Sequence, residues 1–118
     1  MFYLSEGLDD GDIIGQERFE IAEKDHAEDA YEKVTACGTV LLRRYLPLII
    51  KGTASRIKQD HSKATIFPKL SLKNNQIDLD NDTADEIYKK IRALSKPYRG
   101  AYIMKDGKKL IFWRAELE

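Results

Sequence analysis

The chain has 118 residues, of which 42% are hydrophobic and 34% are charged, and its formal net charge is zero. This length allows one ordinary domain or two small subdomains, and no apolar run approaches the roughly 20 residues that a membrane-spanning helix needs. The start lacks a secretory signal pattern, and the single cysteine excludes an internal disulfide and fits a reducing compartment, so we expect a cytoplasmic protein with no membrane partner.

The zero net charge conceals an asymmetry. Residues 1–32 carry eleven acidic and two basic side chains, whereas residues 33–118 carry eighteen basic and nine acidic ones. Either the two halves neutralise each other in one folded body, or the basic half faces a phosphate-bearing partner. No aromatic residues are interleaved on a known nucleic-acid module, so the sequence leaves both interpretations open.

The chain opens with an acidic loop, residues 6–12, which holds three aspartates and two glycines. The loop lies between an apolar start, residues 1–4, and the stretch 12–22, whose partial alternation of apolar and polar residues is typical of a strand. We therefore expect residues 1–4 and 12–22 to pair as strands joined by the acidic loop.

So many like charges in one turn are hard to explain by packing. Asp9, Asp10 and Asp12 are therefore the candidates for acid–base chemistry. The alternative is a solvated turn in which Asp10 or Asp12 accepts hydrogen bonds from local N–H groups. A calcium loop is disfavoured, because its spacing lacks the twelfth-position glutamate.

A long helix is predicted next. Asp25 and Glu28 have the spacing of a capping box, and Gly52 suits the left-handed residue that ends a helix. Pro47 should kink or break the last turn. Apolar residues recur at steps of three and four and so share one face: Ala27, Ala30, Tyr31, Val34, Cys37, Leu41, Tyr45 and Leu48.

A polar connector, residues 53–63, leads to a smaller region. There Thr83 and Glu86 form a second capping box, and the helix that follows should end before Pro97. Its inner stripe is predicted to be Ile87, Ile91 and Leu94.

The last predicted element is a β-hairpin. Asp106 and Gly107 lie between two β-prone runs, 101–104 and 110–113, and an Asp-Gly pair in that setting is a strong hairpin signal.

Other chemistry finds little support. No cluster of cysteines and histidines has the spacing of metal ligands, so no metal is expected. His26 and His61 are interpreted as surface residues, and Cys37 as a small core residue. No glycine-rich phosphate cradle or serine elbow is present.

Several segments stand in the order that one known family has. They are GLDDGDIIGQ at 7–16, YLPLIIKG at 45–52, HSKATIFPKL at 61–70, and the runs within 91–102 and 107–115. Together they resemble the folate-dependent formyltransferases, a family that includes methionyl-tRNA formyltransferase and the N-formyltransferases of nucleotide-linked amino sugars. Any single segment is weak evidence, but the ordered set covers nearly the whole chain.

The resemblance implies an α+β fold. Residues 1–52 would be the C-terminal end of the catalytic domain, with a strand pair and a long helix. Residues 53–63 would be a linker, and residues 64–118 would form the C-terminal subdomain of a small helix and a β-hairpin, in a short or truncated form.

The resemblance also implies formyl transfer from 10-formyltetrahydrofolate to a primary amine. Asp9 matches the family's catalytic aspartate, which orients a histidine and accepts a proton as the amine attacks. Glu6, Gly7 and Leu8 would line the pterin pocket. The family's Asn-x-His segment lies upstream of the aspartate and is not found here. Because loss of such groups costs several orders of magnitude in rate, we expect the chain alone to be inactive.

The acceptor amine is less defined. A chain that stops at Glu118 is closer to the amino-sugar enzymes than to methionyl-tRNA formyltransferase, which continues into a full small β-barrel, although a trimmed chain would look the same.

The rival from another class is a non-catalytic basic module that binds nucleic acid or dimerises. The apolar helix 27–51 predicts a homodimer or pairing with a missing N-terminal half.

Overall fold

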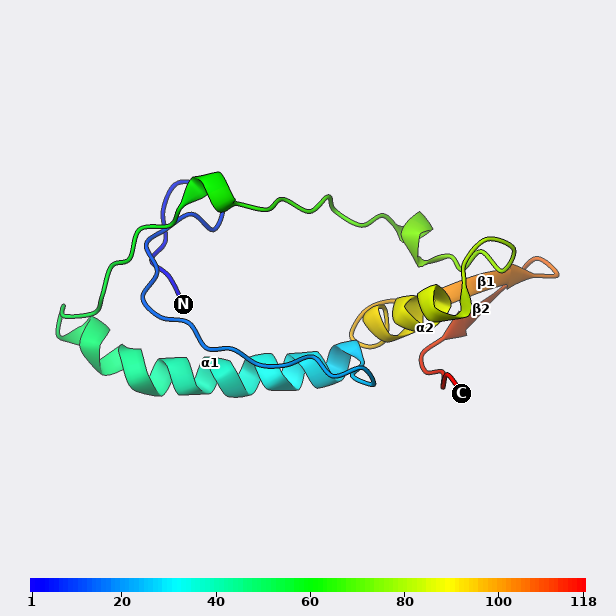
Figure 1. Cartoon of the computed structure of the whole chain (residues 1–118), viewed down its shortest axis with the longest axis horizontal. Helices are drawn as coiled ribbons and strands as arrows, with labels where there is room; N and C mark the ends of the chain where they lie inside the picture. Colours follow the sequence, from blue (N-terminus) through cyan, green and yellow to red (C-terminus); the bar gives the residue numbers. More distant parts are fainter. The chain divides into compact units, whose positions relative to one another are not determined.

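A computed structural model of the chain describes the backbone of all 118 residues and every side chain except that of Leu72. Its fold is α+β, as the sequence predicts. Within the described part of the chain, no helix combines the length and apolarity that crossing a bilayer requires. The elements follow in the order α1 (Ala27–Ile50), η1 (His61–Lys63), η2 (Leu72–Asn75), α2 (Ala84–Ala93), β1 (Ala101–Lys105) and β2 (Lys108–Phe112) (Figure 1).

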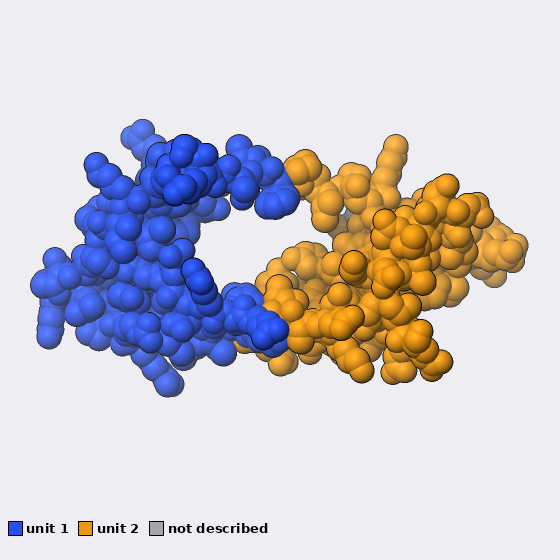
Figure 2. Space-filling model, viewed as in Figure 1, with its two compact units in different colours: residues 1–20, 33–67 blue, residues 21–32, 68–118 orange. Residues whose placement is uncertain are grey.

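The chain packs as two compact units (Figure 2). Unit 1 comprises residues 1–20 and 33–67, and unit 2 comprises residues 21–32 and 68–118. Helix α1 therefore contributes its first turns to unit 2 and its remainder to unit 1. The predicted division into residues 1–52, a linker at 53–63 and residues 64–118 refers to the domains of a longer formyltransferase, and it stays a prediction.

Helix α1 begins with a different cap from the predicted one. The backbone N–H of His26 donates to the carboxylate of Asp29 at 2.8 Å. The carboxylate of Asp25 accepts instead from a backbone N–H in the preceding turn. The predicted box between Asp25 and Glu28 is wrong, because the helix starts one residue later and its third position is Asp29.

The first turn of α1 is tied to the end of α2 within unit 2. The hydroxyl of Ser95 accepts from the N–H of Ala27 at 3.0 Å and donates to the carbonyl of Arg92 at 2.9 Å. The guanidinium of Arg92 donates to the carbonyl of Asp25 at 2.7 Å. Ser95 is buried, so its hydroxyl satisfies polar groups at two helix ends away from water.

Helix α1 ends as the sequence predicts. Gly52 has a φ of 68°, in the left-handed region, and the N–H of Thr53 donates back to the carbonyl of Leu48 at 2.9 Å. The helix continues past Pro47 to Ile50, so Pro47 does not break its last turn.

Helix α1 is unusually exposed. None of its described residues is buried. Several large apolar side chains on it expose at least 38% of their surface: Tyr31, Val34, Val40, Leu42, Leu46, Leu48 and Ile50. An exposed apolar surface of this kind is typical of a helix that packs against another protein segment or another protein.

The predicted strand at 12–22 is not formed. Ile13 makes isolated antiparallel bridges with Phe2 and with Ile57, and no residue from 14 to 22 lies in a strand. Around the bridge between Phe2 and Ile13, backbone hydrogen bonds also join Tyr3 to Asp12 and Met1 to Ile14 and Gly15. Because the N-terminal segment is only a few residues long, this pairing does not extend into a regular ladder.

Helix α2 matches its prediction. The hydroxyl of Thr83 accepts from the N–H of Glu86 at 3.3 Å, and the carboxylate of Glu86 accepts from the N–H of Thr83 at 2.8 Å, which completes the capping box. The inner stripe also packs as predicted, because the core of unit 2 consists of Ile77, Ile91 and Ala101 with Ile87, Leu94, Ile103, Phe112 and Ala115 around them.

The hairpin is also confirmed. Strands β1 and β2 are antiparallel, with Ala101 opposite Phe112 and Lys105 opposite Lys108. Asp106 and Gly107 form the two-residue turn with φ values of 51° and 72°. A turn with both φ values positive matches the twist of the strands.

The carboxylate of Asp82 gives unit 2 a pH-dependent stability. Lys90 Nζ lies 2.6 Å from Asp82 Oδ2, and this hydrogen bond, with another from the N–H of Asp78, holds the pKa of Asp82 below its usual value. A carboxylate with a lowered folded-state pKa stabilises the fold above its unfolded-state pKa and loses that contribution as the pH falls.

We therefore expect the melting temperature to fall as the pH drops through about 4, and to fall less in Asp82→Asn. Thermal unfolding followed by circular dichroism from pH 6 to pH 3 measures this. Glu23→Gln, which changes an exposed carboxylate, is the control and should keep the pH profile of the unmodified chain. Equal slopes for Asp82→Asn and the unmodified chain would contradict the assignment.

Candidate functional site

Backbone hydrogen bonds close the base of the acidic loop within unit 1. The N–H of Tyr3 donates to the carbonyl of Asp12 at 2.9 Å. Ile13 and Ile57 donate to each other's carbonyls at 2.8 and 3.0 Å. The connector after α1 therefore holds the residue that directly follows the loop.

A side-chain amide fixes the tip of the acidic loop. Gln59 Nε2 donates to the carbonyl of Asp9 at 2.8 Å and to the carbonyl of Gly11 at 2.7 Å. Asp9 has a φ of 53°, in the left-handed region that aspartate tolerates better than most residues. Gly11 is buried, and a Cβ there would lie 1.7 Å from the carbonyl oxygen of Tyr3. The hydrogen bonds from Gln59 and the close approach of Gly11 to the carbonyl of Tyr3 therefore set the path of the loop.

The three aspartates of the acidic loop have different surroundings. The carboxylate of Asp10 accepts a hydrogen bond from the hydroxyl of Ser5. Asp12 is paired with Arg56, whose Nη1 lies 3.3 Å from Asp12 Oδ2. Asp9 is exposed, and its carboxylate has no hydrogen-bond or ion-pair partner among the described residues. Of the three, Asp9 has the carboxylate that is free to receive a proton or a ligand group.

The three residues before Asp9 have backbone polar groups that are not hydrogen-bonded within the described part of the chain. Glu6, Gly7 and Leu8 are exposed, and their N–H and C=O groups make no hydrogen bond within the described part of the chain. Leu8 exposes 93% of its surface. The assignment of these three residues to a pterin pocket stays a prediction.

Sequence reasoning missed the residues that hold the loop. It assigned 53–63 to a polar connector, but Arg56, Ile57 and Gln59 each contact the loop or its base. The guanidinium of Arg56 also lies 3.8 Å from the centre of the Tyr3 ring. A lone isoleucine in an otherwise polar run is the signal that could have indicated a pairing partner.

The two histidines differ from each other. His61 is exposed, as predicted. The prediction for His26 is wrong, because its side chain is only 8% exposed and its Nδ1 lies 3.2 Å from the carbonyl of Lys24. Among the described residues, no group of histidine, cysteine, aspartate and glutamate side chains could hold a metal ion.

Gly11→Ala should open the acidic loop. The added methyl collides with the carbonyl oxygen of Tyr3, so we expect a loss of about 1–3 kcal/mol in the free energy of unfolding. Gly38→Ala is the matched control, because a Cβ there meets nothing within 4 Å. That change in a helix should instead stabilise by about 0.5–1 kcal/mol. Urea denaturation measures both, and equal stabilities would contradict the loop geometry.

Comparison with known proteins finds similarity to formyltransferases in sequence and in structure. Residues 69–118 match the family described as formyl transferase, C-terminal domain. The methionyl-tRNA formyltransferase of Halalkalibacterium halodurans is 35% identical over 116 residues, which are 98% of this chain and 36% of that protein. The bifunctional polymyxin resistance protein ArnA of Wigglesworthia glossinidia brevipalpis is 32% identical over 114 residues, 97% of this chain and 17% of that protein.

Solved structures of formyltransferases are also similar to the chain. A 4-N formyltransferase from Francisella tularensis superimposes with a TM-score of 0.77 at 30% identity, over 98% of this chain and 48% of that one. A sugar N-formyltransferase from Shewanella sp FDAARGOS_354 gives a TM-score of 0.75 at 26% identity, over 98% of this chain and 48% of that one. The chain thus spans about a third or less of the curated relatives named above and about half of these two structures.

Proposed function

We propose that this chain, which resembles the C-terminal part of formyltransferases in sequence and in structure, is part of a 10-formyltetrahydrofolate-dependent enzyme that transfers a formyl group to a primary amine. One observation carries the proposal. The similarity extends over 98% of the chain and so includes the acidic loop as well as the C-terminal region. A cytoplasmic location follows from the same proposal.

The residues of the acidic loop would have different roles in formyl transfer. When bound, 10-formyltetrahydrofolate supplies the formyl group. The free backbone of Glu6, Gly7 and Leu8 would bind the polar edge of its pterin. Asp9, exposed and without a partner among the described residues, would orient a histidine and accept the proton that the amine loses. Gln59 and the Ile13–Ile57 bonds would keep Asp9 in position.

The chain should be inactive by itself. In the family, an asparagine and a histidine complete the site, and this sequence holds no Asn-x-His segment. A positioned acid or base contributes about 10²–10⁴-fold to a rate, and an oxyanion-stabilising group contributes about 10²–10³-fold. Asp9 alone therefore supplies too little stabilisation of the transition state.

A nucleotide-linked amino sugar is the acceptor that we propose. Two similar solved structures, with 30% and 26% identity to the chain, are named as a 4-N formyltransferase and a sugar N-formyltransferase. Methionyl-tRNA is the second candidate acceptor. It is favoured by the 35% identity to the methionyl-tRNA formyltransferase of Halalkalibacterium halodurans.

The exposed apolar side chains of α1 fit this proposal. The chain covers 36% of the relative from Halalkalibacterium halodurans, so the rest of such a protein could cover the helix. A second copy of the chain is the other occupant, as in a non-catalytic dimerisation module. The basic residues of 33–118 would in that case bind nucleic acid, with an affinity that falls as salt rises.

The test is a chimera. This chain replaces the corresponding C-terminal part of the Francisella tularensis 4-N formyltransferase, and formyl transfer from 10-formyltetrahydrofolate is measured with a nucleotide-linked amino sugar and with methionyl-tRNA. We expect activity in the chimera and none in the purified chain. Asp9→Asn should lower the rate about 10²–10⁴-fold, because the proton acceptor is lost.

Asp10→Asn is the matched control, and its rate should stay within a few fold of the unsubstituted chimera. Activity of the purified chain alone, or a chimera indifferent to Asp9→Asn, would overturn the assignment of Asp9. Salt-dependent RNA binding by a chain without folate affinity would favour the non-catalytic module. Sedimentation of the purified chain reports whether a second copy covers α1.

A further inference from the structure

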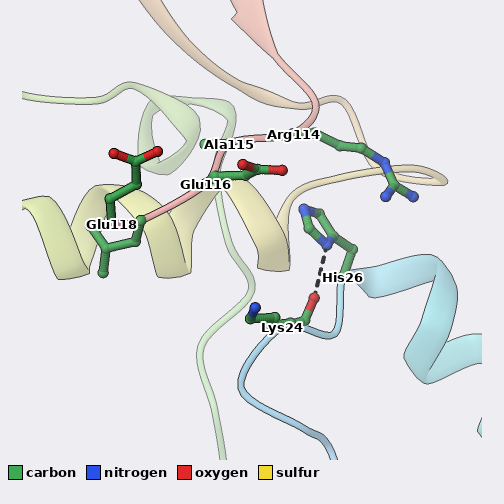
Figure 3. Close-up of a pocket in the computed structure, with 7 residues that line it drawn as sticks. Lys24, His26, Arg114, Ala115, Glu116 and Glu118 are labelled. Atoms are coloured by element: carbon green, nitrogen blue, oxygen red, sulfur yellow. Dashed lines mark hydrogen bonds between the residues drawn. The ribbon is translucent and has the colours of Figure 1, made fainter.

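Unit 2 contains cavities outside the acidic loop, and the polar groups in their walls differ. One cavity, of about 580 Å³, lies between the turn before α1 and the C-terminal segment (Figure 3). The buried side chain in its wall is that of His26, whose Nδ1 lies 3.2 Å from the carbonyl oxygen of Lys24. Because Nε2 of His26 is closed off from solvent, a ligand in this cavity could not reach it.

A second cavity of unit 2, of about 370 Å³, has a different wall. It lies between the end of α2, the loop that follows α2, and η2 with the residues just before it. Its apolar lining residues are Leu70, Ala93, Leu94 and Tyr98, and its polar ones are Ser71, Asn75 and Arg99. An apolar wall with a few polar groups is typical of a site for a small molecule.

Asn75 is the buried polar side chain of this second cavity, with only 7% of its surface exposed. Its Nδ2 donates to the carbonyl of Gly100 at 3.2 Å. A carbonyl can only accept, so this bond fixes the orientation of the amide and makes Oδ1 the free end. Oδ1 has no hydrogen-bond partner in the described part of the chain and, unlike Nε2 of His26, is not closed off from solvent. A ligand in the cavity therefore meets a fixed acceptor that lacks a donor.

Arg99 adds a positive charge beside this acceptor. It directly precedes Gly100, whose carbonyl binds Asn75 and whose N–H donates to the carbonyl of Leu94 at 2.8 Å. Arg99 is exposed, and its guanidinium has no hydrogen-bond or ion-pair partner among the described residues. No aspartate or glutamate is among the described residues that line the cavity. The wall thus favours an anionic group, and a carboxylate fits the planar guanidinium.

The same charge decides which donor can bind to Asn75. An ammonium group near Oδ1 would be repelled by the guanidinium of Arg99, whereas a neutral N–H would not. The wall therefore selects a molecule that combines a carboxylate, a neutral N–H and an apolar part.

We propose that this cavity binds an N-acylated α-amino acid with an apolar side chain. The amide N–H of the ligand donates to Oδ1 of Asn75, and its carboxylate accepts from the guanidinium of Arg99. Its side chain packs against Leu70 and Leu94. This inference does not rest on the proposed formyl transfer, because the acidic loop belongs to unit 1 and the cavity to unit 2.

The experiment titrates the whole chain with N-acetyl-L-leucine at pH 7.5. Two control ligands each lack one group. The methyl ester of N-acetyl-L-leucine has no carboxylate, and its O-acetyl analogue has an ester oxygen in place of the N–H.

We expect the side-chain amide resonances of Asn75 to shift with saturation when N-acetyl-L-leucine is added. The dissociation constant should be at least about tenfold higher for the methyl ester and several fold higher for the O-acetyl analogue, since a charged and a neutral hydrogen bond are lost. Unchanged resonances with N-acetyl-L-leucine, or equal affinities for the three ligands, would overturn the proposal.

Substitutions locate the site. Arg99→Gln should weaken binding of N-acetyl-L-leucine at least about tenfold, whereas Arg43→Gln, a change at an exposed residue of unit 1, should leave it unchanged. Asn75→Ala should remove the preference for N-acetyl-L-leucine over the O-acetyl analogue. If Asn75→Ala does not fold, Arg99→Gln and the control ligands still decide. Equal affinities for Arg99→Gln and Arg43→Gln would place the ligand elsewhere and overturn the proposal.

Discussion

Two backbone hydrogen bonds between Ile13 and Ile57 hold the site-bearing end of this chain. The residues are far apart in the sequence, and their pairing brings the connector after α1 against the acidic loop. Gln59 can then reach the carbonyls of Asp9 and Gly11. Without this pairing, the base of the loop would rest on the short N-terminal segment, through the bridge between Phe2 and Ile13 and the backbone hydrogen bonds of Met1 and Tyr3.

Unit 2 depends on a different kind of constraint. Ile77, Ile91 and Ala101 form its buried core, and Ser95 bonds the start of α1 to the end of α2 from a buried position. The segment just before α1 is thereby fixed in unit 2, which also buries His26. Packing and side-chain hydrogen bonds thus hold unit 2, whereas backbone pairing holds the acidic loop of unit 1.

Local chemistry predicted the elements that depend on local contacts. The capping box of Thr83 and Glu86, the left-handed stop at Gly52 and the Asp106-Gly107 turn all follow from residues within a few positions. Features set by distant partners could not be predicted in this way. The strand at 12–22 does not form because most of it has no neighbouring strand, and His26 is buried by residues that lie much later in the sequence.

Asp9, Asp10 and Asp12 look alike in sequence. The family resemblance selected Asp9, and Ser5 and Arg56 give a physical reason by occupying the other two.

Amide hydrogen exchange at Ile13 and Ile57 tests the central claim most directly, since both N–H groups are donors in the pair that holds the acidic loop. In the 118-residue chain, both amides should exchange at least about tenfold more slowly than those of Glu6, Gly7 and Leu8, which make no hydrogen bond within the described residues. Exchange of Ile13 and Ile57 at the rates of an unstructured peptide would contradict the account, because the loop would then have no fixed position for Asp9.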